Sequence, residues 1–88
     1  FEARKKVTVH KVTVRFRKES FDGTVRIKSS FSPKGELVKV DSEYDDLVRV
    51  IEGAKKRLGV DLSFRELKKK IQEQVSKGRG ETVLERRI

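Results

Sequence analysis

The strongest constraint on the fold is a two-residue alternation of apolar side chains near the start of the chain. Within residues 5–17 the apolar side chains occupy one phase and then the other: Val7 and Val9 first, then Val12, Val14 and Phe16. Successive side chains of a strand point to opposite faces, so this pattern predicts β-structure with a change of phase at residues 10–11. Either a β-bulge restores a single buried face there, or the segment forms two short strands.

Two further strands are expected, each after a turn. The Asp22-Gly23 pair is typical of hairpins and predicts a turn over residues 19–23. Alternating residues then predict a strand over 24–31, and a second turn over 32–35 holds the single proline. A third strand over 36–40 completes a three-stranded antiparallel meander.

Two helices are expected after the strands. Ser42 is a good N-cap for the first helix, and Gly59 is its expected left-handed stop. The second helix opens with a capping box at Ser63 and Glu66 and ends near Gly78. The apolar residues at helical spacing are Tyr44, Leu47, Val48, Ile51, Ala54 and Leu58 in the first helix, and Leu67, Ile71 and Val75 in the second.

These elements predict one small α+β domain over residues 1–88, with a three-stranded antiparallel sheet covered on one face by two helices. Residues 82–84 predict a short C-terminal edge strand within a basic tail over residues 78–88. No run approaches the ~20 apolar residues of a membrane span, and the first residues contain no apolar signal core. We therefore expect a cytoplasmic protein that does not bind membranes.

The charge of the chain is strongly basic and unevenly distributed. The net charge is +9, to which residues 1–40 contribute +7, residues 41–62 contribute −2 and residues 63–88 contribute +4. Such an excess of Lys and Arg favours an anionic partner, most commonly nucleic acid, or else a nucleotide phosphate or an acidic protein surface. The alternative interpretation is the solvated, charge-rich surface of a heat-adapted protein.

Outward-facing basic residues on neighbouring strands predict an anion-binding sheet face, and a basic helix adds a second group. The aromatic residues Phe16 and Phe31 fall on the apolar phase, so we expect phosphate contact without stacking on bases. Ordinary solvated surface is the alternative for every member. The predicted anion-binding residues are Arg15, Arg17, Arg26, Lys28, Lys68 and Lys69.

Four of the fourteen acidic residues stand within six positions: Asp41, Glu43, Asp45 and Asp46. On a helix that starts at Ser42 they surround the first turn and offset the positive end of the helix dipole, which is the favoured interpretation. The second interpretation is a partner-binding site, in which the acids pair with a basic strand of another copy or another protein. Oxygen ligation of a metal ion is the third, and we predict neither a metal nor a cofactor.

Catalytic chemistry has little support in the sequence. The chain has one histidine, His10, and no cysteine. It contains no Ser-His-Asp pattern, no His pair at metal-binding spacing and no phosphate-binding glycine loop. We therefore expect a binding or assembly module that is not an enzyme on its own.

Three short runs resemble the C-terminal region of the nickel-insertion protein of nickel-pincer cofactor synthesis. They are Val25-Arg26-Ile27-Lys28, Gly35-Glu36-Leu37-Val38-Lys39-Val40 and Glu43-Tyr44-Asp45-Asp46. This resemblance implies an accessory module of a larger nickel-insertion or nucleotide-handling enzyme, although Ser42 stands where that family has Pro. The basic hairpin followed by an acidic stretch is also similar to ubiquitin-like and Phox-type interaction domains, which implies head-to-tail association.

Overall fold

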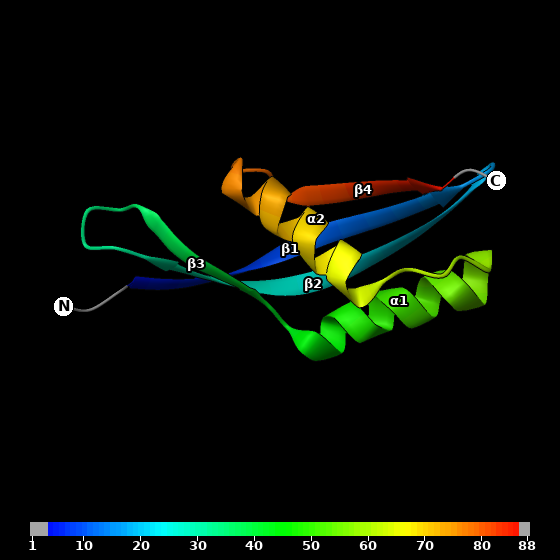
Figure 1. The fold of residues 1–88 in the computed structure, drawn as a ribbon, viewed down its shortest axis with the longest axis horizontal. Helices are drawn as coiled ribbons and strands as arrows, with labels where there is room; N and C mark the ends of the chain where they lie inside the picture. The colour runs from blue at the N-terminus through cyan, green and yellow to red at the C-terminus, as the bar shows by residue number, and fades with distance from the viewer. Residues whose placement is uncertain (1–3, 87–88) are drawn as a thin grey trace.

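The computed structural model describes residues 4–86 and shows a four-stranded mixed sheet with two helices (Figure 1). The elements are β1 (Arg4–Phe16), β2 (Glu19–Phe31), β3 (Leu37–Ser42), α1 (Tyr44–Leu58), α2 (Phe64–Ser76) and β4 (Glu81–Arg86). The strand order is β3-β2-β1-β4, in which β4 runs parallel to β1 and the other pairs are antiparallel. The α+β class is confirmed, and the three antiparallel strands form the predicted meander. The predicted C-terminal edge strand is also present as β4, which is longer than the expected residues 82–84.

β1 is one continuous strand, so the predicted bulge or break at residues 10–11 is wrong. All thirteen of its residues pair in unbroken register with the thirteen residues of β2. The change of apolar phase therefore turns Val7 and Val9 away from the core, where they are 64% and 65% exposed. The side of the sheet that faces away from the helices, called the open face below, thus carries valines beside its basic residues.

The first hairpin turns at Arg17 and Lys18 and not at Asp22-Gly23. Arg17 adopts a positive φ of 57°, whereas Gly23 lies inside β2. Gly23 is suited to its place for another reason, because a Cβ atom there would come within 2.9 Å of Val50 Cγ2 in α1. The glycine marks a close approach between helix and sheet.

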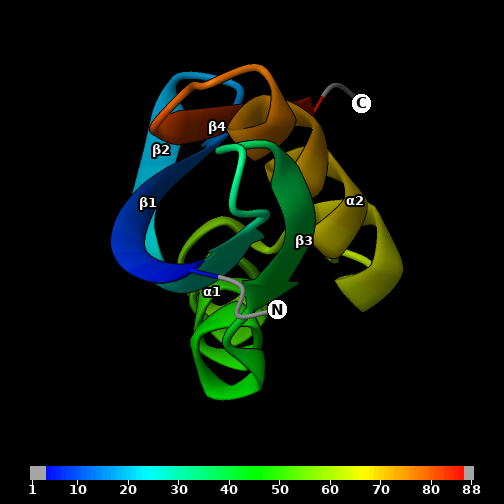
Figure 2. The same cartoon turned by 90° about the vertical axis from the view of Figure 1, so that its left-hand side faces the viewer.

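The core lies between the sheet and the two helices. α1 packs mainly on β2, whereas α2 contacts both β3 and β4 across the curved sheet (Figure 2). Leu67 and Ile71 of α2 are buried as predicted, but Tyr44 of α1 is 64% exposed and Val50 takes part in the core. The buried apolar residues are Val12, Val14, Val25, Ile27, Leu47, Val50, Ala54, Val60, Leu62, Leu67, Ile71 and Leu84.

The predicted helix start is confirmed for α2 and wrong for α1. Ser63 Oγ accepts a hydrogen bond from the Glu66 N–H at 3.4 Å and caps α2. Ser42 instead ends β3, and within the described residues its buried hydroxyl has no hydrogen-bond partner. Glu43 is the N-cap of α1 and makes no capping bond through its side chain, while Gly59 ends the helix at φ 69° as predicted.

At one end the strands form an arm, seen on the left of Figure 1. Most of the arm lies beyond both helices, but α2 contacts its β3 part, where Gln72 Nε2 donates to the Val40 C=O at 3.4 Å. The arm consists of residues 4–10 and 28–40, and the molecule measures 48 × 22 × 18 Å. Residues 4–9 of β1 are exposed on both faces of the sheet. β4 does not cover the arm, since its pairing with β1 begins at Lys11.

The last described residues form a strand. Glu85 and Arg86, which we expected in a basic tail, belong to β4, while residues 87–88 lie outside the described residues. Arg86 forms an ion pair with Glu66, which fastens β4 to α2. Neither helix in residues 4–86 combines the length and the hydrophobicity that a membrane crossing requires.

Candidate functional site

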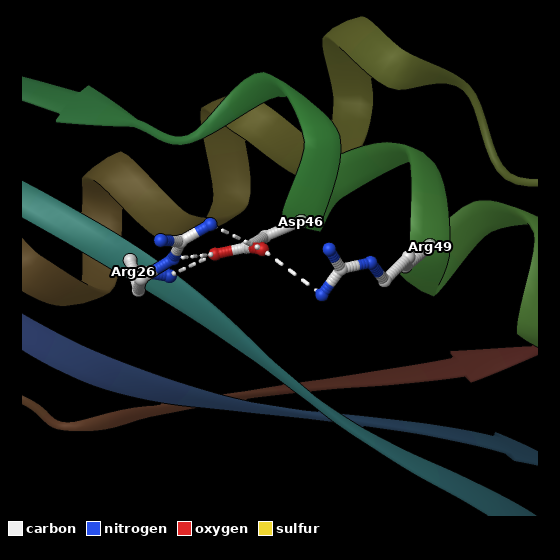
Figure 3. Close-up of polar contacts among 3 residues, drawn as sticks. All are labelled: Arg26, Asp46 and Arg49. Atoms are coloured by element: carbon white, nitrogen blue, oxygen red, sulfur yellow. Dashed lines mark hydrogen bonds and ion pairs between the residues drawn. The ribbon is translucent and has the colours of Figure 1, made fainter.

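Asp46, one of the four clustered acids, fastens the start of α1 to β2 (Figure 3). Arg26 donates to its carboxylate from the backbone N–H at 2.9 Å, from Nε at 2.8 Å and from Nη2 at 3.2 Å. Arg49 lies on the other side, with Nη1 3.5 Å from Oδ1. The hydrogen bonds from the side chain and the backbone of Arg26 lower the pKa of Asp46 to about 2, although burial opposes them.

Asp46 also completes the sheet at the point where β3 ends. The Arg26 C=O accepts a hydrogen bond from the Glu43 N–H at 3.0 Å, so the backbone of Arg26 points toward the β3 side. The next strand residue that could bond the Arg26 N–H is absent because the chain has entered α1. The Asp46 carboxylate replaces the missing strand carbonyl, which gives this acid a structural role that the sequence analysis did not foresee.

The other three acids do not form one patch with Asp46. Asp46 is 4% exposed, whereas Glu43 and Asp45 are exposed at the start of α1. Asp41 lies on the open face, with its carboxylate 3.6 Å from Lys39 Nζ. Within residues 4–86, no three His, Asp or Glu side chains are grouped closely enough to hold a metal ion. The predicted partner-binding set is thus divided between the interior and separate parts of the surface.

The predicted basic residues on the strands are also divided. Arg15 and Lys28 lie on the open face, as predicted. Arg17 lies in the hairpin turn, with its guanidinium carbon 5.2 Å from the centre of the Phe16 ring. Arg26 is engaged by Asp46, which compensates its charge.

The predicted basic residues on α2 lie in the helix layer and not on the open face. Lys68 is half-buried and Lys69 is exposed. Lys69 borders a shallow hollow whose other charged residues are of both signs: Arg65, Glu66, Lys70 and Glu73. The structure therefore does not bring Lys68 and Lys69 together with Arg15 and Lys28.

The arm is strongly basic. Its 20 residues contain six Lys or Arg and one acid, so the arm carries +5 of the net charge of +9. Lys5 lies on the open face in the same phase as Val7, and Lys28 is directly opposite Val7 on β2. The sequence analysis missed Lys5, because the predicted bulge would have turned its phase toward the core.

The side chain of His10, in β1, is buried beside β4 at the base of the arm. It is 2% exposed, and its Nε2 and Thr82 Oγ1 are joined by a hydrogen bond of 2.7 Å. Burial lowers the pKa of His10, and the charge of the neighbouring Glu81 opposes this shift. The sequence analysis gave His10 no site role, and the structure makes it a link between the two parallel strands.

The position of His10 predicts a loss of stability in mild acid. A histidine in an unfolded chain has a pKa near 6.5, so just below this value the unfolded state binds the proton more readily. The stabilisation is complete above pH 6.5 and is lost as the pH falls, by at most about 1.4 kcal/mol per pH unit. We expect the wild-type Tm, measured by circular dichroism, to fall between pH 7.5 and 5.5, while that of His10→Gln stays level. Equal slopes for the two proteins would contradict this role.

Comparison with protein-family models, curated proteins and solved structures finds no match to this chain. The resemblances to the nickel-insertion protein and to ubiquitin-like and Phox-type domains therefore stay predictions. The physical basis for a functional proposal is the arm with its exposed strands and its concentration of positive charge.

Proposed function

We propose that this protein is a nucleic-acid-binding module that contacts the phosphate backbone through the arm. The observation that carries the proposal is the charge of the arm, +5 in 20 residues, against +4 in the remaining 68. The arm lies at one end of the molecule (Figure 1), and its six basic side chains are all exposed: Arg4, Lys5, Lys6, Lys28, Lys34 and Lys39. Lys and Arg that replace condensed counterions on the phosphates supply most of the sequence-independent affinity for nucleic acid.

The open face extends this basic surface along the sheet. Lys5 and Lys11 are six residues apart on one strand, which separates them by about 20 Å. Lys28 lies between them on the neighbouring strand. Among residues 4–86, no acid forms an ion pair with any of these three lysines. Glu81 and Asp41 lie beside Lys11 and Lys28 on the neighbouring strands, but no ammonium group of the three is held in an ion pair among residues 4–86, so each can turn toward a phosphate.

The arrangement favours binding without sequence preference. Base stacking needs exposed aromatic rings beside the basic residues. Phe16 and Phe21 lie on the helix side of the sheet and pack against the core, and the open face presents Val7 and Val9 in their place. The contact therefore depends on phosphate charge and strongly on salt.

A charge-reversal experiment tests the proposal. Lys28→Glu combined with Lys34→Glu changes the arm from +5 to +1, and we expect the Kd for labelled RNA or DNA to rise at least tenfold. Two lost phosphate contacts should also reduce the slope of log K against log salt by roughly 2 for a duplex. Fluorescence anisotropy with single-stranded and duplex probes at several salt concentrations measures both quantities.

The matched control is Lys69→Glu combined with Lys70→Glu on α2, which lowers the net charge by the same amount. We expect this variant to bind within threefold of the wild type. Equal losses in the two variants would show that total charge, and not the arm, determines binding. No salt-dependent binding by the wild type at low ionic strength would refute the proposal altogether.

A further inference from the structure

β1 has a free edge along the arm. Among residues 4–86, β4 pairs with β1 only over residues 11–16, so residues 4–10 have a neighbouring described strand on the β2 side alone. The Lys11 N–H donates to the Gly80 C=O at 3.0 Å, which shows that the backbone groups of odd-numbered residues point to the β4 side. Because backbone direction alternates along a strand, the N–H and C=O groups of Lys5, Val7 and Val9 point out from this edge.

The pairing of β1 with β4 shows which side chains suit a strand beside β1. On the open face Glu81 lies beside Lys11, Val83 beside Thr13 and Glu85 beside Arg15. The last pair is an ion pair, with Arg15 Nη1 3.7 Å from Glu85 Oε1. On this face of β4, acidic side chains thus lie beside basic ones of β1, and an apolar side chain lies beside a neutral one.

The free edge also presents a basic side chain followed by neutral ones, but no strand among residues 4–86 lies beside it. Lys5, Val7 and Val9 share the open face, and both valines are about two-thirds exposed. A matching strand places an acid opposite Lys5 and apolar residues opposite the two valines. A second copy that used the same edge would pair antiparallel about Val7, which places Lys5 beside Val9 and leaves both lysines without an acidic partner.

We propose that the edge of β1 from Lys5 to Val9 binds an extended acidic peptide of a partner protein as an added strand, in line with β4. The backbone groups of three residues supply the hydrogen bonds, and the alternation of an acid with apolar side chains supplies the specificity. β4 limits the length of the added strand, since it occupies the same edge from Lys11 onward. The inference shares Lys5 with the proposed nucleic-acid surface, but it rests on the strand edge and its backbone groups, which phosphate contact does not need.

The probe is a fluorescein-labelled heptapeptide, Glu-Thr-Val-Thr-Val-Thr-Glu, which has the same pattern in both strand directions. In either direction one Glu lies opposite Lys5 and the two valines lie opposite Val7 and Val9, while the other Glu leaves the edge where β4 begins. We expect it to bind the wild type and to slow amide hydrogen exchange at Lys5, Val7 and Val9. The same peptide with Lys at both ends should bind at least tenfold more weakly. Absence of binding at millimolar peptide, or protection only at other residues, would overturn the proposal.

Two variants separate edge pairing from simple charge attraction. Val7→Pro removes an outward N–H without removing a bond to β2, and we expect it to weaken acidic-peptide binding at least tenfold. Lys5→Glu keeps the backbone intact and should exchange the preference, so that the Lys-ended peptide binds better than the Glu-ended one. The Lys5→Glu result decides the matter if Val7→Pro fails to fold.

The test is also distinct from that of nucleic-acid binding. Lys28→Glu with Lys34→Glu should weaken nucleic-acid binding and leave the peptide Kd within threefold of the wild type. Val7→Pro should weaken peptide binding and leave nucleic-acid binding unchanged. Loss of peptide binding in both variants would overturn the edge proposal. So would a peptide-free dimer, detected by light scattering, whose amides at residues 5–9 are already protected, because the occupant would then be a second copy.

Discussion

Gly53→Val is expected to lower the free energy of unfolding by about 2–3 kcal/mol, because it overfills the contact between α1 and β2. A Cβ atom on Gly53 would lie 2.3 Å from Cζ of Phe21 and 2.8 Å from Cε1. The Phe21 ring occupies the space that Gly53 and Gly23 leave open, and the Arg57 guanidinium carbon lies 5.9 Å from its centre. The ring cannot stay in place beside the larger side chain, so α1 or the ring must shift.

The effect should depend on the Phe21 ring. In a Phe21→Ala background, Gly53→Val should cost at least about 1 kcal/mol less than in the wild type, since coupled neighbours show interaction energies of this size. Gly80→Val is the control, because nothing lies within 4 Å of a Cβ atom at that position. Urea unfolding of the four proteins and the control measures these free energies. An unchanged cost without the ring would place the strain elsewhere.

The parts of the fold that the sequence predicts well are those with local causes. The second helix begins at Ser63 and the first ends at Gly59, because a capping side chain and a left-handed glycine act within a few residues. Leu67 and Ile71 are buried because helical spacing alone sets the face that they share. The α+β class follows from such segments taken together.

The errors have non-local causes. The Asp22-Gly23 pair resembles a turn, yet Gly23 is there to admit Val50 from a helix that lies far along the chain. Val7 and Val9 resemble core residues, but the unbroken register of β1 places them on the side of the sheet that faces away from the helices. Periodicity gives the phase of a strand and cannot tell which face a distant helix covers.

The candidate site was predictable to the same degree. Arg15 and Lys28 were placed correctly on an outward face, because each alternates with apolar neighbours in a uniform phase. Lys5 was not predicted, because the expected bulge would have turned it, together with Val7, toward the core. Arg26 was assigned to anion binding, although it pairs with Asp46. That contact joins residues twenty positions apart, and no local pattern in either segment indicates it.

Asp46→Ala is expected to lower the free energy of unfolding by about 2 kcal/mol, which is roughly 8–16 °C in Tm for a chain of this size. The variant removes three hydrogen bonds from Arg26 and leaves the Arg26 N–H without its carboxylate partner. This loss of about 2 kcal/mol is near the low end for the removal of a charged hydrogen-bond partner, because the Arg26 side chain is 56% exposed and can return to water. Asp45→Ala, the exposed neighbour, should cost no more than about 1 kcal/mol through the helix dipole.

The pH dependence identifies the carboxylate as the cause. Asp46 has its pKa lowered from 3.8 to about 2, so its contribution is present above pH 4 and is lost as the pH falls toward 2. The Tm difference between wild type and Asp46→Asn should therefore be constant from pH 7 to 5 and shrink steadily below pH 4. The difference between wild type and Asp45→Asn is the reference, measured by thermal unfolding over the same range. A wild-type advantage over Asp46→Asn that persists undiminished at pH 2 would mean that shape and packing at this position, and not the ionised carboxylate, hold α1 against β2.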